Sequence, residues 1–173
     1  MLSVIIECDD NEPELAHTLS SLVVGAVEGL ISDVTVLDRR ASEGTSLVAE
    51  AAGCRYFRNW DLTDVVTSVR GDWILVLEPG ARPLSGWVDV IHEHIATETK
   101  PARFSESRRH RRAFWKRLFT RRCPLEAGLL LPKPIALEKA RECGTSPFAM
   151  ARRMMTRRLS CELIPASAMP RLR

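Results

Sequence analysis

The sequence has no long hydrophobic run and no paired cysteines, and these absences exclude whole classes of protein. No apolar run approaches the roughly 20 residues that span a bilayer, and the acidic start, with Glu7, Asp9 and Asp10, does not resemble a signal peptide. The five cysteines are odd in number and widely spaced, without a Cys-x-x-Cys pair. They predict neither a disulfide framework nor a zinc site. We therefore expect free thiols, a reducing compartment and a cytoplasmic location.

Internal repeats and low-complexity tracts are also absent. The 173 residues, 45% hydrophobic and 27% charged, have an ordinary globular composition. This length suits one well-buried core and is short for two, so we expect a single domain over residues 1–173.

Positive charge is scarce in the first part of the chain and abundant in the second. Residues 1–100 hold 7 Lys/Arg against 17 Asp/Glu, a net charge of −10, whereas residues 101–173 hold 18 against 5, a net charge of +13. Such asymmetry indicates that the second part faces an anionic partner, which is phosphate, nucleic acid or a membrane surface. The alternative is that the two parts attract each other.

Short apolar runs alternate with amphipathic helical patterns over the first 100 residues. The predicted strands are Leu2–Ile6, Asp33–Asp38, Arg55–Phe57 and Gly71–Leu77. This alternation predicts an α/β fold with right-handed βαβ units and a mainly parallel sheet. The run from Gly71 is the predicted central strand. It ends at Glu78, and open α/β sheets bind ligands beyond the carboxyl ends of their strands.

After residue 127 the patterns predict a shorter set of elements. They are a strand at Gly128–Leu131, helices at Pro134–Cys143 and Phe148–Leu159, and a last strand at Cys161–Ile164.

Residues 101–127 read as a basic amphipathic insertion. If its central segment, residues 108–122, is helical, arginines surround one apolar stripe. The residues of this predicted surface are Arg108, Arg112, Phe114, Trp115, Leu118 and Phe119. The pattern is typical of a helix that binds an anionic membrane surface, and equally of a helix packed on its own sheet. Nucleic acid is not an expected partner, because nothing else in the sequence is typical of a nucleic-acid-binding module.

Several motifs in order and at matching spacing resemble the family-2 glycosyltransferases. They are Val4-Ile5-Ile6, Asn11-Glu12, Leu19-Ser20-Ser21-Leu22, Val36-Leu37-Asp38, Glu43-Gly44-Thr45, Gly71-Asp72-Trp73-Ile74-Leu75 and Pro83 to Trp87. A weaker continuation runs from Gly128 to Ala166. The resemblance implies a GT-A fold, a Rossmann-like three-layer sandwich. Residues 1–100 would form its nucleotide-binding half, and residues 128–173 a reduced acceptor half.

The resemblance also implies residues that this chain has replaced. Where the family shows Pro-Thr-Tyr-Asn, with a tyrosine at the nucleotide base, the chain has Glu7-Cys8-Asp9-Asp10. After the second strand Asp38 is kept, but the next carboxylate of the family is Arg39. The predicted nucleotide-sugar contacts are therefore Asp9, Asp38, Arg39 and Glu78. For Asp38 the alternative is a carboxylate that caps the following turn and helix. For Arg39 and Arg40 it is pairing with Asp9 and Asp10.

The metal and general-base positions of the family are altered as well. Its Asp-x-Asp, which binds a divalent metal, is replaced by Glu78 and Gly80, and a glycine has no side chain for a metal. Its late Glu-Asp pair is replaced by Ser146-Pro147. Glu126 is the remaining candidate for a general base. We expect no cofactor, and Mg²⁺ or Mn²⁺ at Glu78 only if the residual site is active.

Two functions follow from these features. The first is a glycosyltransferase-like protein with weak or no transferase activity, which serves as a binding or scaffolding module at the inner membrane surface. The second is a divergent active glycosyltransferase that moves a sugar from a nucleotide sugar to a lipid-linked or envelope acceptor. In both, a nucleotide diphosphate or nucleotide sugar is the expected small-molecule partner.

Overall fold

The computed structural model of the chain describes residues 1–107, 123–152 and 154–168, and a single eight-stranded sheet runs through them. Its strands are β1 (Leu2–Cys8), β2 (Ile31–Asp38), β3 (Arg55–Phe57), β4 (Trp73–Leu77), β5 (Arg82–Pro83), β6 (Ala102–Glu106), β7 (Leu129–Pro132) and β8 (Arg157–Ile164). Their order across the sheet is β3-β2-β1-β4-β7-β6-β8-β5. The four predicted strands of the first 100 residues are all present.

The sheet has a parallel half and a mixed half. Strands β3, β2, β1 and β4 are parallel neighbours. Strand β7 is antiparallel to β4 and to β6, whereas β8 is parallel to β6 and antiparallel to β5. The predicted central position of the strand after Gly71 is confirmed, because β4 pairs with β1 on one side and with β7 on the other.

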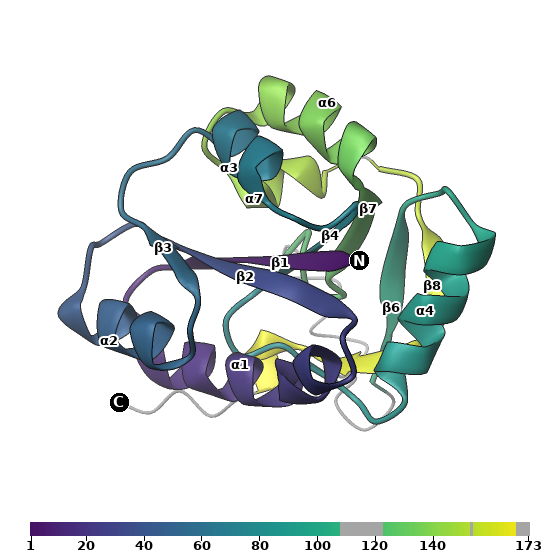
Figure 1. The fold of residues 1–173 in the computed structure, drawn as a ribbon, viewed down its shortest axis with the longest axis horizontal. Coiled ribbons are helices and arrows are strands. Elements are labelled where there is room, and N and C mark those ends of the chain that lie inside the picture. Colours follow the sequence, from purple (N-terminus) through teal and green to yellow (C-terminus); the bar gives the residue numbers. More distant parts are fainter. Residues whose placement is uncertain (108–122, 153, 169–173) are drawn as a thin grey trace, which may run out of the picture.

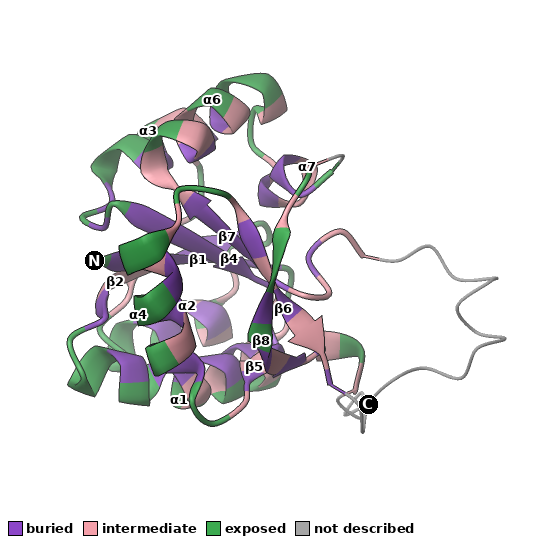
Figure 2. Ribbon diagram, turned by 90° about the vertical axis from the view of Figure 1, so that its right-hand side faces the viewer, coloured by how far each residue is buried: buried purple, intermediate pink, exposed green. Residues whose placement is uncertain are grey.

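Helices cover both faces of the sheet, which confirms the three-layer prediction. They are α1 (Glu12–Val27), α2 (Glu43–Ala51), α3 (Leu62–Ser68), α4 (Trp87–Thr97), α6 (Lys133–Cys143) and α7 (Pro147–Met150). Helices α3, α6 and α7 lie on one face, and α1 and α2 on the other, where α4 packs beside β8 (Figure 1). The outward sides of α1, α4 and α6 are exposed, while strands β1 and β4 are buried (Figure 2).

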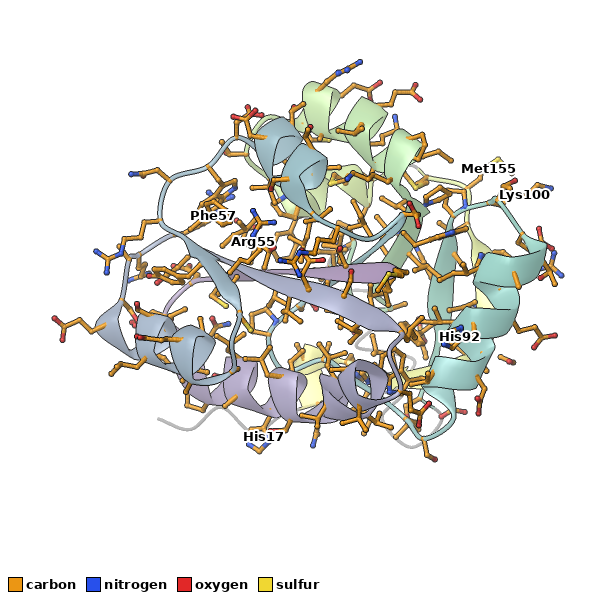
Figure 3. All side chains as sticks on the ribbon, in the orientation of Figure 1. His17, Arg55, Phe57, His92, Lys100 and Met155 are labelled. Atoms are coloured by element: carbon orange, nitrogen blue, oxygen red, sulfur yellow. The ribbon has the colours of Figure 1, made fainter. Side chains whose placement is uncertain are left out.

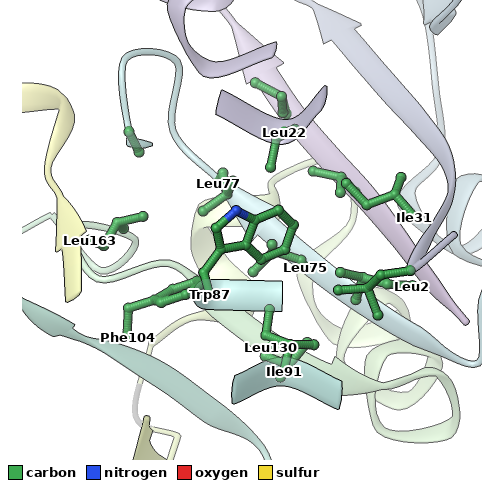
Figure 4. Close-up of a cluster of buried hydrophobic side chains, with 14 of the residues drawn as sticks. Leu2, Leu22, Ile31, Leu75, Leu77, Trp87, Ile91, Phe104, Leu130 and Leu163 are labelled. Atoms are coloured by element: carbon green, nitrogen blue, oxygen red, sulfur yellow. The ribbon is translucent and has the colours of Figure 1, made fainter. Parts of the chain in front are cut away.

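The core divides according to the alternation of side chains along the strands. Leu75 of β4 joins the cluster under α1 and α4, whereas its neighbour Ile74 joins the cluster under α3 and α6. Trp87, 2% exposed, lies in the first cluster, among side chains from β4, β6 and β8 (Figure 4). This one side chain therefore ties the parallel half of the sheet to the mixed half.

The predicted helix Phe148–Leu159 is wrong. Helix α7 ends at Met150, and β8 begins at Arg157. Along β8 burial alternates with a period of two, because Leu159 and Cys161 are buried while the residue between them is exposed. Met155, labelled in Figure 3, is 94% exposed and therefore lies outside the core.

Residues 108–122 lie outside the described residues. The membrane-interface interpretation of Arg108, Arg112, Phe114, Trp115, Leu118 and Phe119 therefore stays a prediction. Within the part of the chain that the structure describes, no helix has the length and apolar character needed to cross a bilayer.

Gly71 stands at a close approach between two backbones. A Cβ atom on this residue would lie 2.5 Å from the Ser3 nitrogen and 2.7 Å from the Leu2 carbonyl carbon. The Gly71 N–H also donates a hydrogen bond to Ser3 Oγ at 2.8 Å. Because the opposing atoms are backbone, they have no rotamer with which to move aside.

We predict that Gly71→Ala destabilises the protein by about 3 kcal/mol, because forcing an extra carbon into a packed site costs on the order of 1–3 kcal/mol and backbone relieves it poorly. Urea unfolding measures the change. The control is Gly53→Ala, whose Cβ meets nothing within 4 Å but whose φ of +67° is left-handed, for a cost of about 1–2 kcal/mol. Equal losses in the two variants would contradict the close-approach explanation.

Candidate functional site

The carboxyl ends of β1, β2 and β4 meet at one edge of the sheet. Because the three strands are parallel, their register pairs Cys8 with Asp38 and Ile6 with Leu77. The next residues along the chain, including Asp9, Arg39 and Glu78, therefore follow neighbouring strands. The structure brings these predicted nucleotide-sugar contacts to the same edge, and their partners decide what each can do.

Asp38 is fully buried, and its carboxylate accepts three hydrogen bonds from its own chain. The Arg40 N–H donates to one oxygen at 3.1 Å. The Ser42 N–H and the Tyr56 hydroxyl donate to the other at 2.8 and 2.7 Å. Ser42 in turn caps α2 by accepting the Thr45 N–H. Asp38 thus stabilises the turn that leads into α2. This is the capping role that the sequence offered as the alternative to a nucleotide contact.

Arg39 turns inward and pairs with Glu7. Glu7 is only 5% exposed, and one of its oxygens, Oε2, is buried without a hydrogen-bond partner among the described residues. Burial raises the pKa of the Glu7 carboxyl, although the Arg39 charge opposes that rise. The Arg39 guanidinium also lies over the Trp60 ring, 5.7 Å from its centroid. The sequence predicted Asp9 or Asp10 as the partner of Arg39. The signal for the actual partner was Glu7, a carboxylate within the apolar strand β1.

Arg40 pairs with Asp9 at 2.6 Å, as the structural alternative for these loops anticipated. Both side chains are more than half exposed. Asp9 therefore lies on the surface of the strand-end edge with a positive charge beside it. This pairing offsets part of the acidic charge that follows β1.

The turn after β4 forms hydrogen bonds with Cys123 on one side and with α1 on the other. Glu78 accepts a hydrogen bond from the Cys123 thiol. Burial, and then this bond, raise the pKa of Cys123 to about 12, so the thiol is protonated near neutral pH. The Gly80 N–H donates to Thr18 Oγ1 at 2.7 Å and to the Glu14 carbonyl at 3.0 Å, both on α1. Cys123 was not among the predicted site residues.

The residues present do not reproduce the Asp-x-Asp metal site that the resemblance implies. Glu78 is the one carboxylate of the altered motif, and Gly80 contributes only backbone. Within residues 1–107, 123–152 and 154–168, no three His, Cys, Asp or Glu side chains gather as a metal-binding group. A divalent cation held by protein oxygens needs several such ligands, or one or two with water and phosphate.

Glu126, the candidate general base, lies in the turn before β7. It is half-buried, and the Ser167 hydroxyl donates to its Oε1 at 3.4 Å. Its charge contributes to the raised pKa of Cys123, so Glu78, Cys123 and Glu126 are electrostatic neighbours. Glu126 also borders a cavity of about 320 Å³ between β6, β8 and the turn before β7.

The fold is similar to that of solved sugar-transfer enzymes. Glucosyl-3-phosphoglycerate synthase from Mycobacterium tuberculosis, solved with Mn²⁺, UDP and glucosyl-3-phosphoglycerate, matches over 78% of this chain with 15% identity and a TM-score of 0.57. Mannosyl-3-phosphoglycerate synthase from Rubrobacter xylanophilus matches over 78% with 13% identity and a TM-score of 0.59. The predicted GT-A fold is confirmed.

These matches cover 57% and 54% of the two enzymes, so the chain spans little more than half of their length. The sequence matches no protein-family model and no curated protein. At this identity the similarity concerns the fold alone. Function therefore depends on the residues where the carboxyl ends of β1, β2 and β4 meet, which we call the strand-end edge.

We predict that the stability of the wild-type protein, relative to Glu7→Gln, falls as the pH rises. A pKa that is higher in the folded state means that the folded protein binds more protons than the unfolded chain above the usual value of 4.5. The free energy of unfolding then decreases with pH until the folded pKa is passed, with a slope below about 1.4 kcal/mol per pH unit.

Urea unfolding of both proteins at a series of pH values measures this difference. Glu93→Gln, an exposed carboxylate on α4, is the matched control and should leave the pH dependence unchanged. A wild type that gains stability relative to Glu7→Gln with rising pH would show that the Arg39 ion pair outweighs burial.

Proposed function

We propose that this chain is a glycosyltransferase-like binding module with little or no transferase activity. The observation that supports the proposal is that the polar side chains of the strand-end edge already form hydrogen bonds and ion pairs with other residues of this chain. The Asp38 carboxylate accepts hydrogen bonds from two backbone N–H groups and from the Tyr56 hydroxyl. At the neighbouring strand end, Arg39 is held by Glu7.

The chemistry of transfer explains why this occupation matters. A nucleotide diphosphate leaves with developing negative charge, which metal ions or pre-oriented cations stabilise. Here Glu78 accepts from the Cys123 thiol, and Gly80 stands at the second metal position of the resemblance. The two guanidinium groups at this edge are also paired, that of Arg39 with the buried Glu7 and that of Arg40 with Asp9. Glu78 and Arg39 would each have to break this contact before binding a metal ion or a diphosphate.

The UDP complexes of the structural neighbour supply the ligand for a test. Glucosyl-3-phosphoglycerate synthase was solved with Mn²⁺, UDP and glucosyl-3-phosphoglycerate, and separately in complex with UDP. UDP with and without Mn²⁺ is therefore the pair of conditions that separates a residual nucleotide site from a metal-dependent transferase.

We predict that calorimetric titration with UDP gives no gain in affinity when Mn²⁺ is added, because the described residues offer no multidentate metal site. A parallel assay with UDP-glucose should give no transfer to water or to 3-phosphoglycerate. Robust transfer that Glu78→Ala abolishes and the exposed control Glu93→Ala preserves would falsify the proposal.

The second function, a divergent active transferase, would use arginines in place of a metal. One specific outcome of the same titration supports it. UDP that binds without metal, and that loses at least about tenfold in affinity in Arg39→Ala, would place a guanidinium on the diphosphate, since a hydrogen bond to a charged group is worth about 1.5–3 kcal/mol. Arg70→Ala, which removes an exposed charge just before β4 at the opposite end of that strand, is the control for lost surface charge.

For its location we propose the cytoplasm, with peripheral attachment to the inner face of a membrane through residues 108–122. Eight of these 15 residues are Lys or Arg, and each basic residue near an anionic surface contributes about 1 kcal/mol. We predict cosedimentation with phosphatidylserine vesicles and none with neutral phosphatidylcholine vesicles. Binding that persists after Phe114, Trp115, Leu118 and Phe119 are all replaced by Ser would contradict insertion of the apolar stripe.

A further inference from the structure

A groove between α1 and α2 has apolar walls and an apolar floor. The two helices lie side by side on one face of the sheet (Figure 1), and the groove between them has a volume of about 410 Å³. Val23 and Ala26 of α1 belong to one wall, Val48 and Ala51 of α2 to the other, and Val34 of β2 to the floor. The volume falls within the range of about 300–1,000 Å³ that is typical of binding pockets.

The interior of the groove is uncharged. Its lining contains no Asp, Glu, His, Lys or Arg. The hydroxyl of Ser20 donates to the Ala16 carbonyl of its own helix at 2.8 Å. Burial raises the pKa of Cys54 to about 11, so this thiol is protonated near neutral pH. A group that fills the groove must therefore be apolar, because a charge placed there would lose its hydration without gaining a partner.

The apolar surface continues from the groove onto the solvent side of the two helices. Among the described residues, six large apolar side chains are exposed, and four of them lie on α1 and α2. Val23, which lines the groove, is 56% exposed, and Val27, one turn further along α1, is 79% exposed. Leu47 of α2 is 66% exposed. Exposed apolar side chains that gather in this way indicate an interaction surface.

The rim of this groove is acidic. Neither α1 nor α2 contains Lys or Arg, whereas together they contain Glu12, Glu14, Glu43 and Glu50. Glu28 follows directly after α1. Glu28 and Glu50 lie close in sequence to lining residues near the carboxyl ends of the helices. Within the described ranges these two carboxylates form no ion pair.

The two helices are joined at their amino ends, and their carboxyl ends lack positive charge. Ser42, the cap of α2, donates a hydrogen bond to Glu12 of α1 at 2.6 Å. Each helix connects one parallel strand to the next, so both run in the same direction, away from the strand-end edge. The carboxyl end of a helix has a partial negative charge that cations stabilise. Neither helix has a basic residue in its last turn.

A basic amphipathic helix matches both the shape and the charge of this surface. Such a helix presents an apolar stripe at spacings of three and four residues, and it binds along a groove with its polar face outward. Its Lys and Arg side chains would flank the stripe and meet the acidic rim. A neutral hydrocarbon would leave the rim carboxylates unpaired. An anionic lipid, or the acidic face of a second copy, would be repelled.

We propose that the groove between α1 and α2 binds a basic amphipathic helix of a separate protein. The apolar stripe of that helix packs on Val23 and on the floor of the groove, and its cations lie beside Glu28 and Glu50. This docking surface goes beyond the proposed function. It shares no residue with the strand-end edge, so an active transferase could have it equally.

The test is titration of the full chain with a peptide of about 18 residues, long enough to be helical, that carries Leu on one face and Lys on the other. We expect binding by calorimetry that weakens as salt is added, and amide chemical-shift changes at Ser20, Val23 and Ala51. A peptide with Glu in place of Lys, and one with the leucines scrambled, should not bind. Val23→Asn should weaken binding about tenfold, because a buried valine side chain is lost.

The matched control is Val24→Asn, which replaces the neighbouring valine of the same helix. Val24 is 43% exposed and does not belong to the groove lining. Because both valines are exposed, neither replacement removes a core side chain. Equal weakening in the two variants, shift changes confined to other regions, or equal binding of the Glu peptide would overturn the proposal.

Other occupants of the groove give distinct results in the same experiment. Self-association that Val23→Asn abolishes, without binding of the Lys peptide, would assign the groove to a second copy of the chain. Peptide binding only in the variant whose apolar stripe in residues 108–122 is replaced by Ser would assign the groove to that segment. Either result, or no binding to both proteins, would overturn docking of a separate protein.

Discussion

The parallel pairing of β1 between β2 and β4 is the constraint on which the rest of the structure depends. It fixes a common direction for three strands, so the residues after their carboxyl ends must share one edge of the sheet. Glu7, Asp9, Asp38 and Glu78 are crowded there as a result. Carboxylates that are crowded and partly buried must gain donors or cations, because an unpaired buried charge is costly. The loops of this edge supply such partners.

In an enzyme of the same fold, the polar groups at this edge would be available to bind a metal ion or a nucleotide. In this chain they are bound to each other. Arg39 faces Glu7, Arg40 faces Asp9, and a protonated thiol faces Glu78. Each of these partners comes from the chain itself, so two of the carboxylates are ion-paired, and Glu78 accepts a hydrogen bond, without a ligand. The two core clusters on either side of the sheet are built from apolar side chains, and of these groups only Cys123 packs against one of them.

The sequence was informative where a feature depends on local periodicity, and less so where it depends on distant partners. The strand after Gly71 and the turn at Asp38 follow from patterns of a few residues, and both were predicted. The second half of β8 was predicted as the strand Cys161–Ile164, but its first residues were assigned to a helix, because Met150, Met154 and Leu159 satisfy helical spacing as well as they satisfy a short helix followed by a strand. The Glu7–Arg39 pair joins residues 32 positions apart, and its choice over Asp9 depends on which side chain points into the sheet.

The segregation of charge along the chain acquires a structural meaning from these contacts. In the acidic first part, the arginines at the strand-end edge are taken up by carboxylates. In the basic second part, Arg103 is oriented by carbonyl groups, which fix a guanidinium but do not neutralise it. Attraction between the two parts does reach Arg157, through Glu98, but it leaves Arg103 and Arg158 without an ion pair within the described residues. Of the 18 Lys/Arg in residues 101–173, Arg103, Arg157 and Arg158 line one cavity together with the carboxylates Glu106 and Glu126.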